Sequence, residues 1–129
     1  MSKDINSYED DYADLPFEST QARLRREDVI RLLELHESRN VLEVGCGRGG
    51  GSAFVARHMA PRSMCGCDFS DAAVAFCRRQ HTGLPSLRFE VGDAEALPFE
   101  PASFDLVLNV ESSHCYPDLP AFFREAHRV

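Results

Sequence analysis

The sequence predicts an α/β fold built on a doubly wound parallel sheet. Two observations lead to this fold class. Short apolar runs suited to strands buried on both faces alternate with segments of helical periodicity, and a cluster of glycines directly follows the first of those runs. Strands and helices that alternate at this spacing form parallel β-α units with right-handed crossovers.

The first predicted element is a helix that follows an acidic arm. Acidic side chains gather in residues 1–19, which we expect to be an N-terminal arm ahead of one domain over residues 20–129. A helix is predicted over Thr20–Ser38, because apolar residues recur there at helical spacing and Thr20 can cap its first turn.

Four strands and three further helices are predicted to follow in alternation. Short apolar runs predict strands at Asn40–Val44, Ser63–Cys67 and Phe104–Val110, and alternation predicts one at Leu87–Val91. The helices are bounded by capping and breaking residues, at Ser52–Met59 before Pro61, from the cap Ser70 to His81 before Thr82-Gly83, and at Pro117–His127. Residues 92–101, rich in turn formers, are predicted to be a loop.

The composition is that of an ordinary soluble domain. The 129 residues, 43% of them apolar and 27% charged, suffice for one compact core. The formal net charge of −7 argues against a nucleic-acid partner, because phosphate backbones are held by clusters of Lys and Arg. The sequence shows no secretory leader pattern and no apolar run long enough to cross a bilayer, so we expect a cytoplasmic protein with its five cysteines reduced.

The glycines after the first strand predict a nucleoside-binding turn. Gly45-x-Gly47-x-x-Gly50 satisfies the dinucleotide fingerprint, so the glycines alone do not separate a nicotinamide-dependent enzyme from other nucleoside binders. Glu43 stands two residues before the first glycine, where an acid suits a ligand that bears an ammonium group and no pyrophosphate. A plain strand-to-helix turn is the structural alternative.

The pattern E-x-G-x-G-x-G, formed by Glu43, Gly45, Gly47 and Gly49, resembles motif I of the class I S-adenosylmethionine-dependent methyltransferases. Three later segments also match this family in the expected order: C-D-F-S at residues 67–70, G-D-A-E-A-L-P-F at residues 92–99, and F-D-L-V-L-N-V at residues 104–110, which resembles the fourth-strand motif. The resemblance implies a Rossmann-like fold with S-adenosylmethionine as the methyl donor. It also implies that Glu43 and the glycine loop surround the amino-acid end of that donor.

The resemblance assigns further donor contacts. Asp68, about 20 residues beyond the glycine loop, is expected to accept the ribose hydroxyls. Asp93 and the Ala94 backbone are expected to contact adenine, with Phe69 packed on the adenine face. Asn109, near the end of the fourth strand, is expected to face the methyl donor. Taken singly, Asp68 could be a helix-terminal acid and Asp93 a turn former.

The candidate catalytic residue is His114. The segment Glu111–Asp118 resembles a stretch of methyltransferases acting on sugars, phenolic lipids and other natural products, where a histidine removes a hydroxyl proton. The alternative is a neutral His114 that caps a helix or binds the backbone. Glu111 and Tyr116 are weaker candidates for the substrate side. No metal is expected, because the spacing of the cysteines and His114 matches no zinc motif.

The expected function is methyl transfer to a hydroxyl of a small-molecule acceptor, such as a natural product, lipid or sugar. Three alternatives remain: carbon methylation of a quinone-like ring, donor binding without turnover, and a nicotinamide-dependent oxidoreductase. About four strands of the family's usual seven are recognised, so we expect an incomplete fold, truncated at the C-terminus. In the family's strand order the strand at residues 104–110 would lie at an open edge, where a second copy could pair with it.

Overall fold

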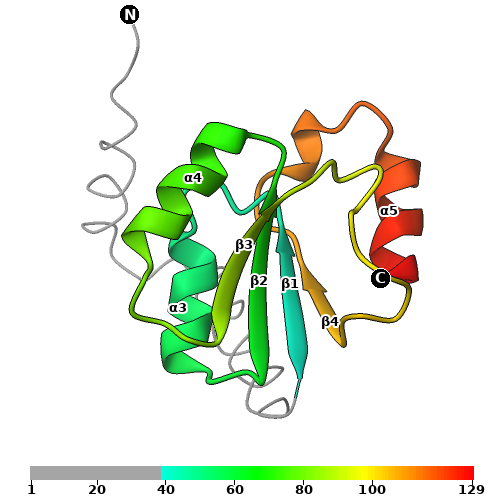
Figure 1. Cartoon of the computed structure of the whole chain (residues 1–129). Coiled ribbons are helices and arrows are strands. Elements are labelled where there is room, and N and C mark those ends of the chain that lie inside the picture. Colours follow the sequence, from blue (N-terminus) through cyan, green and yellow to red (C-terminus); the bar gives the residue numbers. More distant parts are fainter. Residues whose placement is uncertain (1–38) are drawn as a thin grey trace, which may run out of the picture. The chain divides into compact units, whose positions relative to one another are not determined.

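The computed structural model describes residues 39–129, and Figure 1 shows their arrangement. The predicted acidic arm over residues 1–19 and the predicted helix Thr20–Ser38 lie outside the described residues. The described part begins one residue before the first strand, so it includes every motif that points to a nucleoside ligand.

The fold is a parallel four-stranded sheet in the order β3-β2-β1-β4. The strands are β1 (Asn40–Val44), β2 (Ser63–Asp68), β3 (Leu87–Val91) and β4 (Leu106–Leu108). The chain first moves outward from β1 to β3 and then returns to the other side of β1 for β4. This reversal is the doubly wound arrangement that the sequence predicts, and it opens a crevice beyond the carboxyl ends of β1 and β4.

Within residues 39–129, three helices cover the two faces of the sheet. They are α3 (Gly50–His58), α4 (Asp71–Gln80) and α5 (Leu119–Arg128), and a 3₁₀ turn, η1 (Ser113–Cys115), precedes α5. In Figure 1, α3 and α4 lie on one side of the sheet and α5 lies on the other. Helices α3 and α4 each connect two parallel strands, and right-handed crossovers that run in the same direction along the sheet place them on the same face.

Alternate residues of β1 supply the two cores. Val41 packs with Val55 and Ala56 of α3, whereas its neighbour Leu42 packs with Phe122 of α5. All of these side chains are buried, as a strand covered on both faces requires. The sheet is therefore anchored from both sides immediately below the glycine turn that follows Val44.

Helix termini follow the local sequence. The Ser70 hydroxyl accepts a hydrogen bond from the Ala73 N–H at 3.2 Å and caps α4, as predicted. The Asp118 carboxylate accepts one from the Ala121 N–H at 2.9 Å and caps α5, which starts two residues later than the sequence predicts. Such caps satisfy N–H groups that have no partner within the helix.

The last strand is shorter than predicted. The apolar run predicts a strand over residues 104–110, but only Leu106–Leu108 pair with β1. Upstream, the Phe104 N–H donates to the Val129 carbonyl at 2.8 Å instead of to a strand. As predicted, β4 lies at the edge of the described sheet. None of the helices within residues 39–129 combines the length and the apolar character needed to cross a bilayer.

Candidate functional site

A cavity of about 490 Å³ opens beyond the carboxyl ends of the strands. Its walls come from the segments that follow β1, β2, β3 and β4, which is where open α/β sheets bind ligands. Five of the predicted donor-binding residues line it: Gly45, Asp68, Phe69, Asp93 and Ala94. The other lining residues are Val44, Gly92, Glu95, Ser112, Cys115, Tyr116 and Pro117.

The glycine loop has a backbone that favours glycine at three of its positions. Gly45, Gly47 and Gly49 have φ values of 75°, 54° and 80°. The N–H groups of Gly45 and Cys46 both donate to the Cys67 carbonyl, at 2.8 and 3.1 Å. The loop is thus tied to the end of β2, and the spacing of the glycines follows from the left-handed backbone.

Gly45 also makes a close approach that no other residue would permit. A Cβ atom built on it would lie 2.2 Å from the Ser112 hydroxyl and 2.8 Å from the Tyr116 hydroxyl. These contacts are shorter than real Cβ atoms tolerate. The first glycine therefore lets the segment after β4 approach the end of β1.

Asp68 connects the glycine loop to the second strand. Its Oδ2 accepts from the Gly47 N–H at 2.8 Å, and its Oδ1 accepts from the Ser70 N–H at 3.0 Å. Each carboxylate oxygen keeps a further lone pair for a ligand. Since Asp68 is partly exposed at the cavity wall, its carboxylate can accept hydroxyl groups from the cavity.

Glu43 lies beneath the glycine loop and does not line the cavity. Its side chain is buried, and the Ser52 hydroxyl of α3 donates to its Oε2. Burial raises the pKa of this carboxyl above its ordinary value, and the hydrogen bond from Ser52 partly offsets that rise. The structure therefore places Glu43 where it supports the loop and the start of α3 from below.

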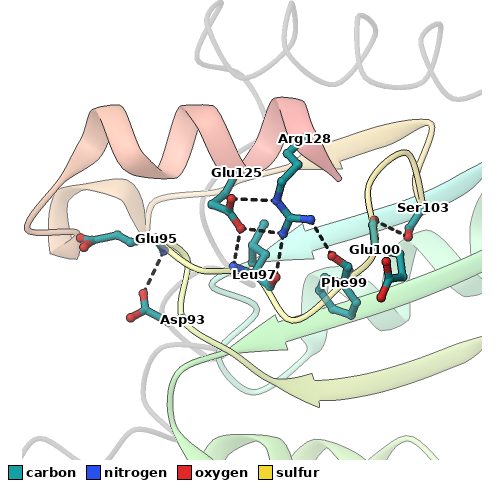
Figure 2. A network of polar contacts seen from close by, with 8 residues as sticks. All are labelled: Asp93, Glu95, Leu97, Phe99, Glu100, Ser103, Glu125 and Arg128. Atoms are coloured by element: carbon teal, nitrogen blue, oxygen red, sulfur yellow. Dashed lines mark hydrogen bonds and ion pairs between the residues drawn. The ribbon is translucent and has the colours of Figure 1, made fainter.

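The segment after β3 also lines the cavity and lies next to the end of β2, where the Gly92 N–H donates to the Asp68 carbonyl at 2.9 Å. Asp93 Oδ1 accepts from the Glu95 N–H at 2.9 Å, and Asp93 forms an isolated antiparallel bridge with Ala96. Figure 2 shows this turn beside α5. Ala94 is buried, whereas Phe69, which also lines the cavity, has 77% of its surface exposed. An apolar ring of this exposure at a cavity wall is available for stacking.

A polar cluster of Asn109, Ser112 and Tyr116 lies beside Gly45. The Asn109 amide Nδ2 lies 3.0 Å from the Val44 carbonyl, 2.8 Å from the Ser112 hydroxyl and 3.0 Å from the Tyr116 hydroxyl. The two hydroxyls are 2.9 Å apart. Ser112 was not singled out from the sequence, although its position after the fourth strand is the signal that could have found it.

His114 lies in the same segment but not at the cavity. It is exposed on η1, whereas its neighbours Ser112, Cys115 and Tyr116 line the cavity wall. Glu111, also a weaker candidate, is exposed and has a left-handed backbone with φ 52°. Of the candidates on this segment, the structure brings Tyr116 to the cavity.

Three buried cysteines, Cys46, Cys67 and Cys77, lie below the glycine loop and at the end of β2. Cys77 donates to the Gly47 carbonyl at 3.2 Å from below the loop. Burial raises the pKa of Cys46, and it raises that of Cys67 to about 12. Thiols in this state are poor nucleophiles, so they serve here as small apolar side chains. Residues 39–129 contain no group of three or more His, Cys, Asp or Glu side chains placed to hold a metal ion.

Comparison with known proteins agrees with this geometry. The methyltransferase domain family matches residues 41–129. The "Probable phthiotriol/phenolphthiotriol dimycocerosates methyltransferase 2" of Mycobacterium ulcerans is 43% identical, over 94% of this chain and 48% of its own length. The fatty-acid O-methyltransferase of Mycolicibacterium smegmatis is 48% identical, over 72% of this chain and 34% of its own.

A solved structure shares the fold. The YcgJ protein of Bacillus subtilis superposes with a TM-score of 0.71 and 28% identity, over 78% of this chain and 43% of its own. The chain thus spans from about a third to about half of the length of the curated relatives it matches. The match of the family to residues 41–129 includes the described sheet apart from Asn40, together with the residues that line the cavity. The chain therefore belongs to the class I S-adenosylmethionine-dependent methyltransferases.

Proposed function

We propose that this chain is the donor-binding part of a methyltransferase that methylates a hydroxyl of a lipid-like small molecule. The observation that supports it most is that Gly45 of the glycine loop, Asp68 and the Asp93–Ala94 turn all line the same cavity. The named substrates of the two mycobacterial relatives support a lipid-like acceptor.

The residues present fit the donor. The cavity has a volume suited to a small ligand, and both Asp68 and the Asp93 turn line it. In this proposal Asp68 binds the ribose hydroxyls, while Asp93, the Ala94 N–H and Phe69 hold adenine. Gly45, Gly47 and Gly49 bring the backbone close to the amino-acid end, and Glu43 supports that end from below.

The protein's part in the reaction is to orient the reactants and remove a proton. When bound, the donor would supply a methyl group from a positively charged sulfur, and that sulfur would become a neutral thioether. Asn109 and the hydroxyls of Ser112 and Tyr116 would orient the reacting groups beside Gly45. The acceptor hydroxyl must lose its proton, and His114 remains the proposed base. Since His114 is exposed, it would have to turn toward the cavity from η1.

The first test measures the binding of S-adenosylhomocysteine by calorimetry. The parent chain should show saturable binding, and Asp68→Asn should weaken it about 10- to 100-fold, because an amide offers one acceptor oxygen in place of two. Asp71→Asn is the matched control, since Asp71 is an exposed carboxylate in the first turn of α4 that does not line the cavity. No saturable binding by the parent, or an equal effect of both substitutions, would contradict the proposal.

The second test concerns the acceptor. A methyl-transfer assay with long-chain hydroxy compounds and fatty acids, against polar sugars, should favour the apolar acceptors. His114→Ala should slow transfer to a hydroxyl strongly while leaving donor binding unchanged. An unchanged rate in that variant would favour carbon methylation, and binding without any transfer would favour a donor-binding module.

A further inference from the structure

The loop that forms the adenine side of the cavity has almost no regular structure of its own. Between β3 and β4 it contains only the isolated bridge of Asp93 and Ala96. Yet its residues Gly92, Asp93, Ala94 and Glu95 line the cavity, and Leu97 is 4% exposed. Something outside the loop must fix its backbone, because the loop lacks a strand neighbour at this point.

Two side chains of α5 take the place of that neighbour. Glu125 Oε2 accepts from the Leu97 N–H at 2.8 Å, and Arg128 Nη2 donates to the Leu97 carbonyl at 2.8 Å. Both backbone groups of Leu97 are therefore satisfied by side chains, as a paired strand would satisfy them. Arg128 Nη1 also donates to the Phe99 carbonyl at 2.7 Å, which extends the contact along the loop.

The two side chains are held by each other. Arg128 Nε donates to Glu125 Oε1 at 2.8 Å, and Arg128 Nη2 donates to Glu125 Oε2 at 2.7 Å, which is a bidentate ion pair. The planar guanidinium thus uses all three of its nitrogens (Figure 2). A lysine has one nitrogen and could not make these contacts together.

The first turn of α5 is joined to the same loop. The Asp118 N–H donates to Glu95 Oε1 at 2.6 Å, while the Asp118 carboxylate caps the helix through Ala121. The segment before Asp118 contributes Ser112, Tyr116 and Pro117 to the cavity. Helix α5 therefore connects to both the adenine wall and the wall beside Gly45.

We propose that the Glu125–Arg128 pair is a positioning element for the nucleoside end of the donor, acting through the backbone of Leu97. The proposal rests on the proposed function, because it takes the Asp93–Ala94 turn to be the adenine site. Neither side chain lines the cavity, so the pair contributes by fixing the turn and not by touching the ligand.

The test compares Glu125→Gln, Arg128→Met and Arg128→Lys with the parent chain. The matched control is Arg78→Met, because Arg78 also donates twice to a backbone carbonyl, that of Phe89, and pairs with Glu90, but lines no part of this cavity. Calorimetry with adenosine and with S-adenosylhomocysteine gives the affinities, and hydrogen–deuterium exchange reports the opening of residues 93–99.

Glu125→Gln and Arg128→Met should each weaken adenosine binding about tenfold and raise exchange in residues 93–99, since each removes charge-assisted hydrogen bonds. Arg128→Lys should fall between Arg128→Met and the parent. Arg78→Met should lower thermal stability and leave the affinity unchanged, which separates positioning from a general structural role.

Three results would overturn the proposal. Unchanged exchange in residues 93–99 would do so whatever the affinities, because the pair would then not hold the loop. An equal loss of affinity in Arg78→Met would assign the effect to stability alone. A parent chain that binds neither ligand would refute the proposed function and, with it, any role of the pair toward a nucleoside.

Discussion

Alanine substitutions at Gly45 and Gly47 test the close approach of Ser112 to the glycine loop. Both have a left-handed backbone, with φ values of 75° and 54°. A Cβ atom at position 47 would meet nothing within 4 Å, whereas one at position 45 would lie 2.2 Å from the Ser112 hydroxyl. Gly47→Ala therefore incurs the conformational cost alone, and Gly45→Ala adds a steric cost to it.

The magnitudes follow from those two costs. A left-handed backbone costs a non-glycine residue about 1–2 kcal/mol, which is the loss of unfolding free energy expected for Gly47→Ala. Overpacking adds about 1–3 kcal/mol, so Gly45→Ala should lose about 2–5 kcal/mol. That is a large part of the stability of an ordinary domain, which is about 5–15 kcal/mol.

Urea unfolding of both variants, followed by circular dichroism, measures these losses. Gly45→Ala should also displace the cluster of Asn109, Ser112 and Tyr116, so it should weaken binding of S-adenosylhomocysteine more than Gly47→Ala does. If Gly45→Ala unfolds at the same urea concentration as Gly47→Ala, the close approach of the segment after β4 is not real.

Two further predictions concern a buried acid and a helix cap. The raised pKa of Glu43 means that the folded chain holds this proton to higher pH than the unfolded chain, so stability from this group is lost as pH rises from about 4.5 through the folded pKa. Glu43→Gln should remove this pH dependence of the free energy of unfolding, which urea unfolding at several pH values measures. A difference between variant and parent that stays constant with pH would contradict this prediction. Asp118→Ala deletes the cap of α5 and should cost about 1 kcal/mol in thermal or urea unfolding; a loss below about 0.5 kcal/mol would show that the cap is not formed in solution.

The sequence predicts the strands best where both faces are buried. The predicted bounds of β1 agree with the structure and β2 is one residue longer, because apolar runs buried on both faces leave little choice. The predicted bounds of β3 also agree, because Leu87, Phe89 and Val91 alternate with charged residues. The run at residues 104–110 predicts a longer strand than β4, since apolar character does not show where the backbone leaves a neighbour. Here the Asn109 side chain approaches the Val44 carbonyl, and the ladder stops at Leu108.

The motifs of the candidate site are predictable from the sequence, but the burial of its side chains is less so. Asp68, Phe69, Asp93 and Ala94 meet at one cavity because the carboxyl ends of parallel strands share an edge. The burial of Glu43 against Ser52 could not be read from spacing, because it depends on how α3 lies over the turn. Whether His114 faces the cavity depends on η1, a three-residue turn that is too short to be predicted from periodicity.

The contacts of Glu125 and Arg128 reach only the peptide groups of the loop, and this has a consequence for how the loop can evolve. All residues have peptide groups, so substituting the exposed side chains of Ala96 and Pro98 should leave the hydrogen bonds of Glu125 and Arg128 to Leu97 in place. Because neither Ala96 nor Pro98 lines the cavity, a library randomised at those two positions should retain binding of S-adenosylhomocysteine.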